Sequence, residues 1–298
     1  MSEHRAWQQP GKTLQLADGR KLGYQIFGDP RGRPVYYCHG WPGSRLECAL
    51  LATNARPLGL AMVALDRPGM GLSDFQPGRR LTDWPDDVEQ VADLLGHERF
   101  GLLGISGGGP YALVCARALA PRLTGTCVVS GMGPADAPGG LAAMGWWHRL
   151  AMPLARHAPW ISRSLFALSA WAARLWPSGV LLAARAVMPG PDKTVLRRPD
   201  FVEIIAPHVR EIFRQGSRGA AHDGELYLHP WGFGLEEVET PVNLWHGELD
   251  LSVPAAFGRA VAQRLPDCRT CFYPHEAHLS TVTNHVEDIL QTAAPGQC

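Results

Sequence analysis

The sequence predicts an α/β fold with a mostly parallel sheet of about eight strands, flanking helices, and a helical cap inserted after the sixth strand. Two observations predict this fold. Short runs of consecutive apolar residues, typical of strands buried on both faces, alternate with segments of helical periodicity. A long stretch without strand patterns interrupts the alternation, which then resumes near the C-terminus. One sheet that receives a helical insertion explains both observations.

The first half of the chain supplies six of the expected strands. Two short strands at residues 13–16 and 22–27 are joined at Asp18-Gly19, a dipeptide typical of hairpin turns. Apolar runs predict four buried strands, and the segments between them predict helices. The strands are expected at residues 35–38, 61–65, 100–105 and 125–130, and the helices at residues 46–58, from Thr82 or Asp83 to Leu95 with Pro85 in the first turn, and from Pro110 to Ala120.

Residues 134–230 are expected to form the cap, and residues 1–133 and 231–298 the core domain. The cap segment is rich in Ala, Leu, Arg and Trp and is interrupted by proline. An insertion between two strands covers the carboxyl ends of the sheet, where open α/β sheets bind ligands. Its tryptophans suggest a large apolar pocket. The helix breaks are expected at Pro153, Pro159, Pro177 and residues 189–191, the last strands at residues 242–246 and 270–273, and the last helices at residues 254–265 and 279–292.

The composition argues against several classes of function. The chain has 298 residues, of which 46% are apolar, and 28 Lys and Arg balance 28 Asp and Glu. A net charge of zero argues against nucleic-acid binding and against a polybasic membrane anchor. We expect no secretory signal, because the first residues lack an apolar region, and no apolar stretch is long enough to span a bilayer. Seven scattered cysteines indicate free thiols, so we expect a cytoplasmic protein.

The segment Gly104-Ile105-Ser106-Gly107-Gly108 lies between an expected buried strand and an expected helix. That context turns a common G-x-S-x-G pattern into a candidate nucleophile elbow, a sharp strand-to-helix turn that exposes a serine. The glycines let other backbone segments approach the strained turn closely. The following helix directs its N-terminal N–H groups at negative charge that forms near the serine. Ser106 is therefore the candidate nucleophile.

A serine hydroxyl needs a neighbouring base, and the base needs an orienting carboxylate. The loops after the last two strands offer both groups, because parallel strands carry their carboxyl ends to one edge of the sheet. Asp250 follows the strand at residues 242–246, and His278 follows the strand at residues 270–273. Asp250 is therefore the candidate acid and His278 the candidate base.

Each of these candidates has an alternative. Glu248 or Asp136 could replace the acid, and His275 could replace the base. We favour His278 because it lies further out on the loop and directly precedes the last helix. Two histidines three residues apart in a loop do not match the four-residue spacing on a helix that zinc binding requires. The C-x-x-C that begins at Cys268 has no second pair, so we expect no metal.

Two backbone N–H groups are candidates for holding the oxyanion of an acyl-transfer reaction. One belongs to Gly107, directly after Ser106. The other belongs to Trp41, in the small loop after the strand at residues 35–38. Arg67, just after the next strand, is interpreted as structural support for the loop beside the site.

Four motifs and a final histidine occur in a fixed order: His39-Gly-Trp-Pro-Gly43, Asp66-Arg-Pro-Gly-Met-Gly71, Gly104-Ile-Ser-Gly-Gly108, His246-Gly-Glu-Leu-Asp250 and His278. Together they resemble the α/β-hydrolase superfamily in its cap-bearing branch. The resemblance implies the α/β-hydrolase fold and a mechanism without a cofactor. It implies Ser106 as nucleophile, His278 as general base and Asp250 as orienting acid, with Trp41 and Gly107 as oxyanion donors. Serine rather than aspartate as nucleophile argues against the dehalogenase and epoxide-hydrolase branches.

We therefore expect a serine hydrolase that cleaves a carboxylic ester of an apolar or aromatic small molecule through an acyl-enzyme on Ser106. The same triad could serve a thioester, a lactone, a carbon–carbon bond or cofactor-free perhydrolysis, because the fold does not select the bond. A receptor-like, ligand-binding protein on a hydrolase scaffold is the alternative from another class. Neither nucleic acid nor a membrane is expected as a partner.

Overall fold

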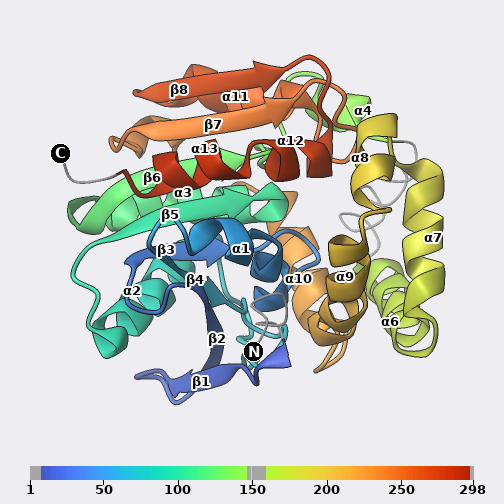
Figure 1. The fold of residues 1–298 in the computed structure, drawn as a ribbon, viewed down its shortest axis with the longest axis horizontal. Coiled ribbons are helices and arrows are strands. Elements are labelled where there is room, and N and C mark those ends of the chain that lie inside the picture. The colour runs from blue at the N-terminus through green and yellow to red at the C-terminus, as the bar shows by residue number, and fades with distance from the viewer. Residues whose placement is uncertain (1–7, 146–148, 150–158, 296–298) are drawn as a thin grey trace.

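The computed structural model describes residues 8–145, 149 and 159–295. Its strands are β1 (Lys12–Gln15), β2 (Lys21–Gly28), β3 (Arg33–Cys38), β4 (Leu60–Leu65), β5 (Phe100–Ile105), β6 (Leu123–Val129), β7 (Val242–Gly247) and β8 (Cys268–Tyr273). They form one sheet in the order β1-β2-β4-β3-β5-β6-β7-β8 (Figure 1). β2 is antiparallel to both β1 and β4, and the other neighbouring strands are parallel. The predicted sheet of eight mostly parallel strands is confirmed.

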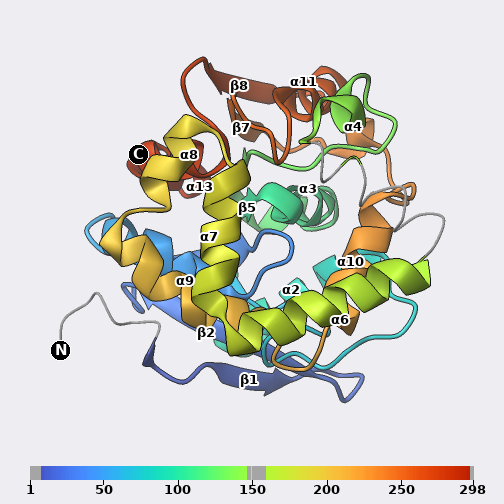
Figure 2. The same cartoon turned by 90° about the vertical axis from the view of Figure 1, so that its right-hand side faces the viewer.

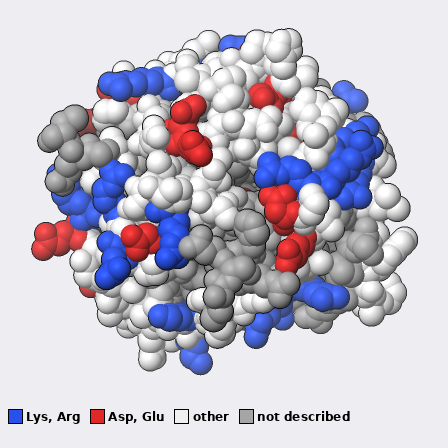
Figure 3. Space-filling view, in the orientation of Figure 1, with Lys and Arg blue, Asp and Glu red and all other residues white. Residues whose placement is uncertain are grey.

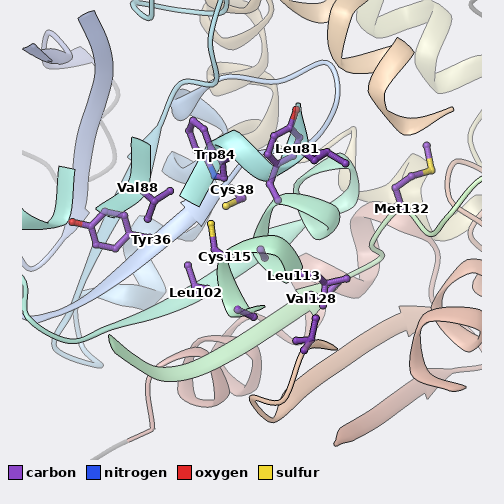
Figure 4. Close-up of a cluster of buried hydrophobic side chains, with 14 of the residues drawn as sticks. Tyr36, Cys38, Leu81, Trp84, Val88, Leu102, Leu113, Cys115, Val128 and Met132 are labelled. Carbon is purple, nitrogen blue, oxygen red and sulfur yellow. The ribbon is translucent and has the colours of Figure 1, made fainter. Parts of the chain in front are cut away.

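Helices cover both faces of this sheet. One face packs against α2 (Trp84–Leu95), α3 (Gly109–Ala118) and α11 (Ala255–Arg264), and the other against η2 (Arg45–Leu51), α1 (Ala52–Ala55) and α13 (Val286–Ala293). Consecutive residues of β3 point to opposite faces, so Tyr36 joins one hydrophobic cluster while Val35 and Tyr37 join the other. Figure 4 shows part of the first cluster, between β3, β5 and α3. Short 3-10 turns complete the layers: η3 (Leu81–Asp83), η4 (Ser106–Gly108), η5 (Ala120–Arg122) and η6 (Leu235–Glu237).

The described part of the segment between β6 and β7 contains helices joined by turns and loops. Its helices are α4 (Gly140–Ala143), α6 (Pro159–Leu175), α7 (Pro177–Val187), α8 (Gly190–Val195), α9 (Pro199–Ile212) and α10 (Arg218–Tyr227). Proline begins α6, α7 and α9 because its fixed φ suits the first turn of a helix. The break expected at Pro153 lies outside the described residues. Helices α6 and α7 lie at the right-hand edge of the molecule in Figure 1 and face the viewer in Figure 2, on the outside of the inserted segment and away from the sheet.

The C-terminal end of helix α10 packs into the main core. Tyr227, Leu228 and Trp231 belong to the same hydrophobic cluster as the buried face of α3. The helical insertion is therefore joined to the sheet by buried apolar contacts. The boundaries of the cap at residues 134 and 230 stay a prediction.

The structure differs from the sequence prediction in two helices. The predicted helix at residues 279–292 is two helices, α12 (His278–Asn284) and α13, separated at His285. Asn284 favours this break because its side chain donates to the Glu276 carboxylate at 3.1 Å, and the ring of His285 stacks on Tyr273 with centroids 3.8 Å apart. The predicted helix at residues 46–58 is a 3-10 turn that continues into the single α-helical turn of α1.

Two further observations concern the surface. Across the residues that the structure describes, no helix has both the length and the apolar character needed to cross a membrane. Lys and Arg side chains lie interspersed with Asp and Glu on the face shown in Figure 3, rather than gathering into a field of one sign.

Candidate active site

Ser106 lies at a sharp turn between β5 and α3. Its φ is +55°, in the left-handed region that side chains other than glycine rarely adopt, which costs on the order of 1–3 kcal/mol. Neighbouring backbone holds the turn, because the Ser106 carbonyl accepts a hydrogen bond from the Met132 N–H at 2.9 Å. Gly108 allows β3 to approach, since a Cβ there would collide with the Cys38 carbonyl. These features are those of a nucleophile elbow.

Asp250 and His278 meet at the edge of the sheet. Nδ1 of His278 lies 2.7 Å from Oδ2 of Asp250. The other oxygen of Asp250 accepts the backbone N–H groups of Ser252 and Val253, each at 2.8 Å, which fixes the carboxylate. Because a carboxylate accepts hydrogen bonds, Nδ1 carries the proton, and Nε2 of the neutral ring is left as a base.

The surroundings of His278 favour its protonated form. Burial alone would lower the pKa of the imidazole, but the carboxylates of Asp250, Asp192 and Glu47 outweigh burial and raise that pKa to about 9. Asp250 contributes both as a charge and as a hydrogen-bond acceptor. The site therefore stabilises the imidazolium that a general base becomes when it takes a proton.

The alternative acids and the alternative base lie apart from this pair. Glu248 is exposed and forms an ion pair with Arg259. Asp136 and His275 are exposed as well. Within the described part of the chain, no group of three or more His, Cys, Asp or Glu is placed to hold a metal ion.

The amide of Trp41 is oriented through its own peptide plane. A trans peptide directs its carbonyl and its N–H in opposite directions. The Gly40 carbonyl accepts from Nη2 of Arg67 at 2.8 Å, so the Trp41 N–H is directed away from that guanidinium. The Ser106 carbonyl, held by Met132, orients the Gly107 N–H in the same way. The Trp41 nitrogen lies 3.1 Å from the point that a Cβ on Gly107 would occupy, which makes the two amides neighbours.

A buried cluster of charges lies behind these two amides. Arg67 is fully buried, donates to the His39 carbonyl, and forms an ion pair with Asp223 at 2.7 Å. Arg79 forms a second ion pair with Asp223. Burial alone would raise the pKa of Asp223, but the two arginines lower it to about 2. The cluster also reaches the elbow, because the Tyr227 hydroxyl donates to the Gly107 carbonyl at 2.8 Å.

Glu47 holds the other side of the loop that carries Trp41. Its carboxylate accepts the Gly40 N–H at 3.1 Å and the Tyr37 hydroxyl at 2.6 Å. Gly40 is therefore held at its N–H by Glu47 and at its carbonyl by Arg67. Sequence reasoning anticipated the supporting role of Arg67 but missed Glu47, Arg79 and Asp223. The one sequence signal for Asp223 is indirect. Arg67 follows a buried strand, and a buried arginine needs a carboxylate partner somewhere in the chain.

The tryptophans of the inserted segment have different environments. Three of them expose 61–70% of their surface: Trp160, Trp171 and Trp176. Trp231 is buried and lines a cavity of about 450 Å³ that includes Asp136 but none of the three candidate triad residues. Phe166 does contact the site, since its ring packs against that of Trp41 with centroids 5.5 Å apart. Trp146 and Trp147 lie outside the described residues.

Comparison with known families matches residues 33–284 to the family described as alpha/beta hydrolase fold. A bifunctional esterase/perhydrolase from Acinetobacter calcoaceticus is 26% identical over 275 residues, which cover 88% of this chain and 90% of that protein. A serine hydrolase-like protein from Danio rerio is 35% identical over 91 residues, which cover 30% of this chain. That match spans only 28% of the length of the Danio rerio protein.

Comparison with solved structures extends the similarity to nearly the whole chain. The epoxide hydrolase CorEH superposes with a TM-score of 0.71 at 17% identity, covering 95% of this chain and 98% of that one. At this level of identity the similarity concerns the fold alone.

Proposed function

The chain belongs to the alpha/beta hydrolase fold family, and from this premise we propose that it is a serine hydrolase that cleaves a carboxylic ester of an apolar or aromatic small molecule. The esterase activity named for the Acinetobacter calcoaceticus relative supports an ester as the substrate. The observation that carries the proposal is the hydrogen bond of 2.7 Å between His278 and Asp250, at the same sheet edge as the strained turn of Ser106.

In the first half-reaction, Oγ of Ser106 attacks the acyl carbon while Nε2 of His278 takes the hydroxyl proton. The carbonyl oxygen becomes an oxyanion, and the N–H groups of Trp41 and Gly107 hold it. Asp250 stabilises the imidazolium. The bond from the acyl carbon to the leaving oxygen then breaks, and His278 returns the proton to that oxygen. The products of this step are an alcohol and an acyl-enzyme on Ser106.

In the second half-reaction, water takes the place of the alcohol. His278 removes a proton from the water molecule, whose oxygen attacks the acyl carbon. The bond to Oγ of Ser106 breaks, and the serine recovers its proton from His278. A carboxylic acid leaves, and the free enzyme is regenerated.

Hydrolysis of p-nitrophenyl acetate and butyrate tests the proposal. We expect turnover by the wild type and a loss of at least about 1000-fold in kcat for Ser106→Ala. Ser164→Ala is the matched control, because that serine is exposed on α6 and its hydroxyl donates to the Trp160 carbonyl one turn earlier in the same helix. Turnover by Ser106→Ala at the rate of the Ser164→Ala control would contradict the proposal.

Perhydrolysis is the second candidate, and the name of the Acinetobacter calcoaceticus relative favours it. Hydrogen peroxide would attack the acyl-enzyme in place of water, which releases a peracid and regenerates Ser106. Peracetic acid formed from acetate and hydrogen peroxide is the product to measure. Its formation by the wild type, and not by Ser106→Ala, would add this activity to the esterase.

A further inference from the structure

The helix that carries His278 has no side-chain oxygen at its N-cap position, and its own capping contact is limited to Oγ of Ser280, which accepts the Ala277 N–H at 2.7 Å. His278 is the first residue of α12, and Ala277 stands at the position before it. A side-chain oxygen at that position ordinarily accepts the first free N–H groups of the helix, and alanine has none. Asp192 on α8 takes this part instead. Its Oδ1 accepts the N–H of Leu279 at 2.9 Å and the N–H of Ser280 at 3.0 Å.

Asp192 is an unusual residue to bury. It is fully buried, and its second oxygen, Oδ2, has no hydrogen-bond partner among the residues that the structure describes. Burying a charged group is costly unless an opposite charge or hydrogen bonds compensate. Burial raises the pKa of Asp192. Of the groups around it that lower this pKa, the positive charge of His278 has the largest effect. The carboxylate therefore gains its main electrostatic compensation from the candidate catalytic histidine.

Titratable groups face His278 from several elements. Asp250 comes from the loop after β7, Asp192 from α8 and Glu47 from η2. The imidazole of His246, at the end of β7, also interacts with His278. The roles of the three carboxylates are separable by their contacts. Asp250 binds the ring, Glu47 binds the Gly40 loop, and Asp192 binds the backbone turn on which the ring is mounted.

We propose that Asp192 is a positioning residue for His278: its carboxylate caps the turn that carries the histidine and adds a second negative charge that stabilises the imidazolium. This inference rests on the proposed role of His278 as general base. It assigns Asp192 a part in the reaction without contact to the substrate. It also ties the chemistry to the segment predicted as the cap, because α8 lies within that segment.

The test compares Asp192→Asn with Asp192→Ala. Asparagine keeps a side-chain oxygen for the two N–H groups and removes only the charge, whereas alanine removes both. Asp200→Asn is the matched control, because Asp200 is a surface carboxylate paired with Arg198. The measured quantity is the rate of Ser106 labelling by a fluorophosphonate between pH 5 and 10. This rate needs the serine and its base but no knowledge of the natural substrate.

We expect the midpoint of the pH profile to fall by about one unit in Asp192→Asn, the shift that loss of one nearby opposite charge produces. We expect the same fall in Asp192→Ala, together with a plateau rate at least about tenfold lower, because the turn loses its cap. Asp200→Asn keeps the wild-type profile. An Asp192→Asn midpoint equal to that of the wild type would overturn the inference.

Two further outcomes are decisive. If the variants fail to fold, the wild type still tests the inference, because a labelling midpoint at or below pH 6.5 would show that the carboxylates add no net stabilisation to the imidazolium. If the wild type is not labelled at Ser106 at any pH, the proposed function fails, and the inference fails with it. Labelling of the wild type with unchanged variant midpoints overturns the inference alone.

Discussion

Nη2 of Arg67 lies 2.8 Å from the carbonyl oxygen of Gly40. Because the Gly40 carbonyl and the Trp41 N–H belong to the same planar peptide group, this contact sets the direction of the Trp41 N–H. The same guanidinium pairs with Asp223 on α10. An ion pair with a helix of the inserted segment therefore supports a candidate oxyanion donor in the core.

Arg67→Lys tests this relationship. Lysine keeps the positive charge beside Asp223 but lacks the planar fork that reaches Asp223 and the loop carbonyls together. We expect kcat for p-nitrophenyl acetate to fall by about 10- to 100-fold with little change in KM, because the loss concerns the transition state. Arg117→Lys, at an exposed ion pair with Glu237, is the control. An unchanged kcat in Arg67→Lys would show that the contact between Arg67 and the Gly40 carbonyl does not orient the Trp41 N–H.

Gly107→Ala tests the second candidate donor. An added Cβ would lie 2.5 Å from Cβ of Trp41 and 2.8 Å from the Tyr227 hydroxyl, so the Trp41 loop must move away. We expect a loss of about 100- to 1000-fold in kcat, the size typical of losing one oxyanion donor. Gly190→Ala is the control, since a Cβ there meets no atom of the described residues within 4 Å. Full activity in Gly107→Ala would contradict the placement of the donors.

The pH dependence of activity follows from the pKa of His278. A general base must be neutral, and burial, which lowers the pKa, is outweighed by the surrounding carboxylates, which raise it to about 9. We expect kcat/KM for an uncharged ester to rise with pH and to level off above about pH 9. Below that, it should fall by about tenfold per pH unit. A profile that is already level at pH 6.5 would contradict the charge environment of His278.

Stability depends on pH in the opposite direction. The folded protein holds the His278 proton up to about pH 9, whereas an unfolded chain releases it near 6.5. The contribution of His278 to the free energy of unfolding is therefore fully present below about pH 6.5 and is lost as the pH rises to about 9. Urea unfolding at both pH values should show a smaller loss of stability for His278→Gln than for the wild type. Equal losses would argue against the shift.

The parts that the sequence predicts are those with local patterns. Apolar runs place β3 to β7 within a few residues, because strands of a parallel sheet that are covered on both faces consist largely of apolar residues. Ser106 is recognisable because glycines surround it between a strand and a helix. Asp250 and His278 are recognisable because both follow strands of one sheet. Both residues follow neighbouring parallel strands, β7 and β8, and therefore lie at the same edge of the sheet.

The parts that the sequence could not predict depend on distant contacts. Asp192 meets residues 87 and 88 positions later, and Asp223 meets an arginine 156 positions earlier. Nothing local distinguishes these aspartates from exposed ones on a helix. Glu47 lies on a 3-10 turn, so helical periodicity did not indicate the direction of its side chain. The missed residues are buried or half-buried polar groups whose partners come from other elements.

Intact mass after incubation with a fluorophosphonate, for the wild type and for Ser106→Ala, tests directly whether Ser106 is an activated nucleophile. We expect one adduct on the wild type and none on the variant, because only a serine activated by His278 displaces fluoride from phosphorus. No adduct on the folded wild type, or an equal adduct on Ser106→Ala, would contradict this expectation. The first of these results would favour a receptor-like protein that binds its ligand without cleaving it.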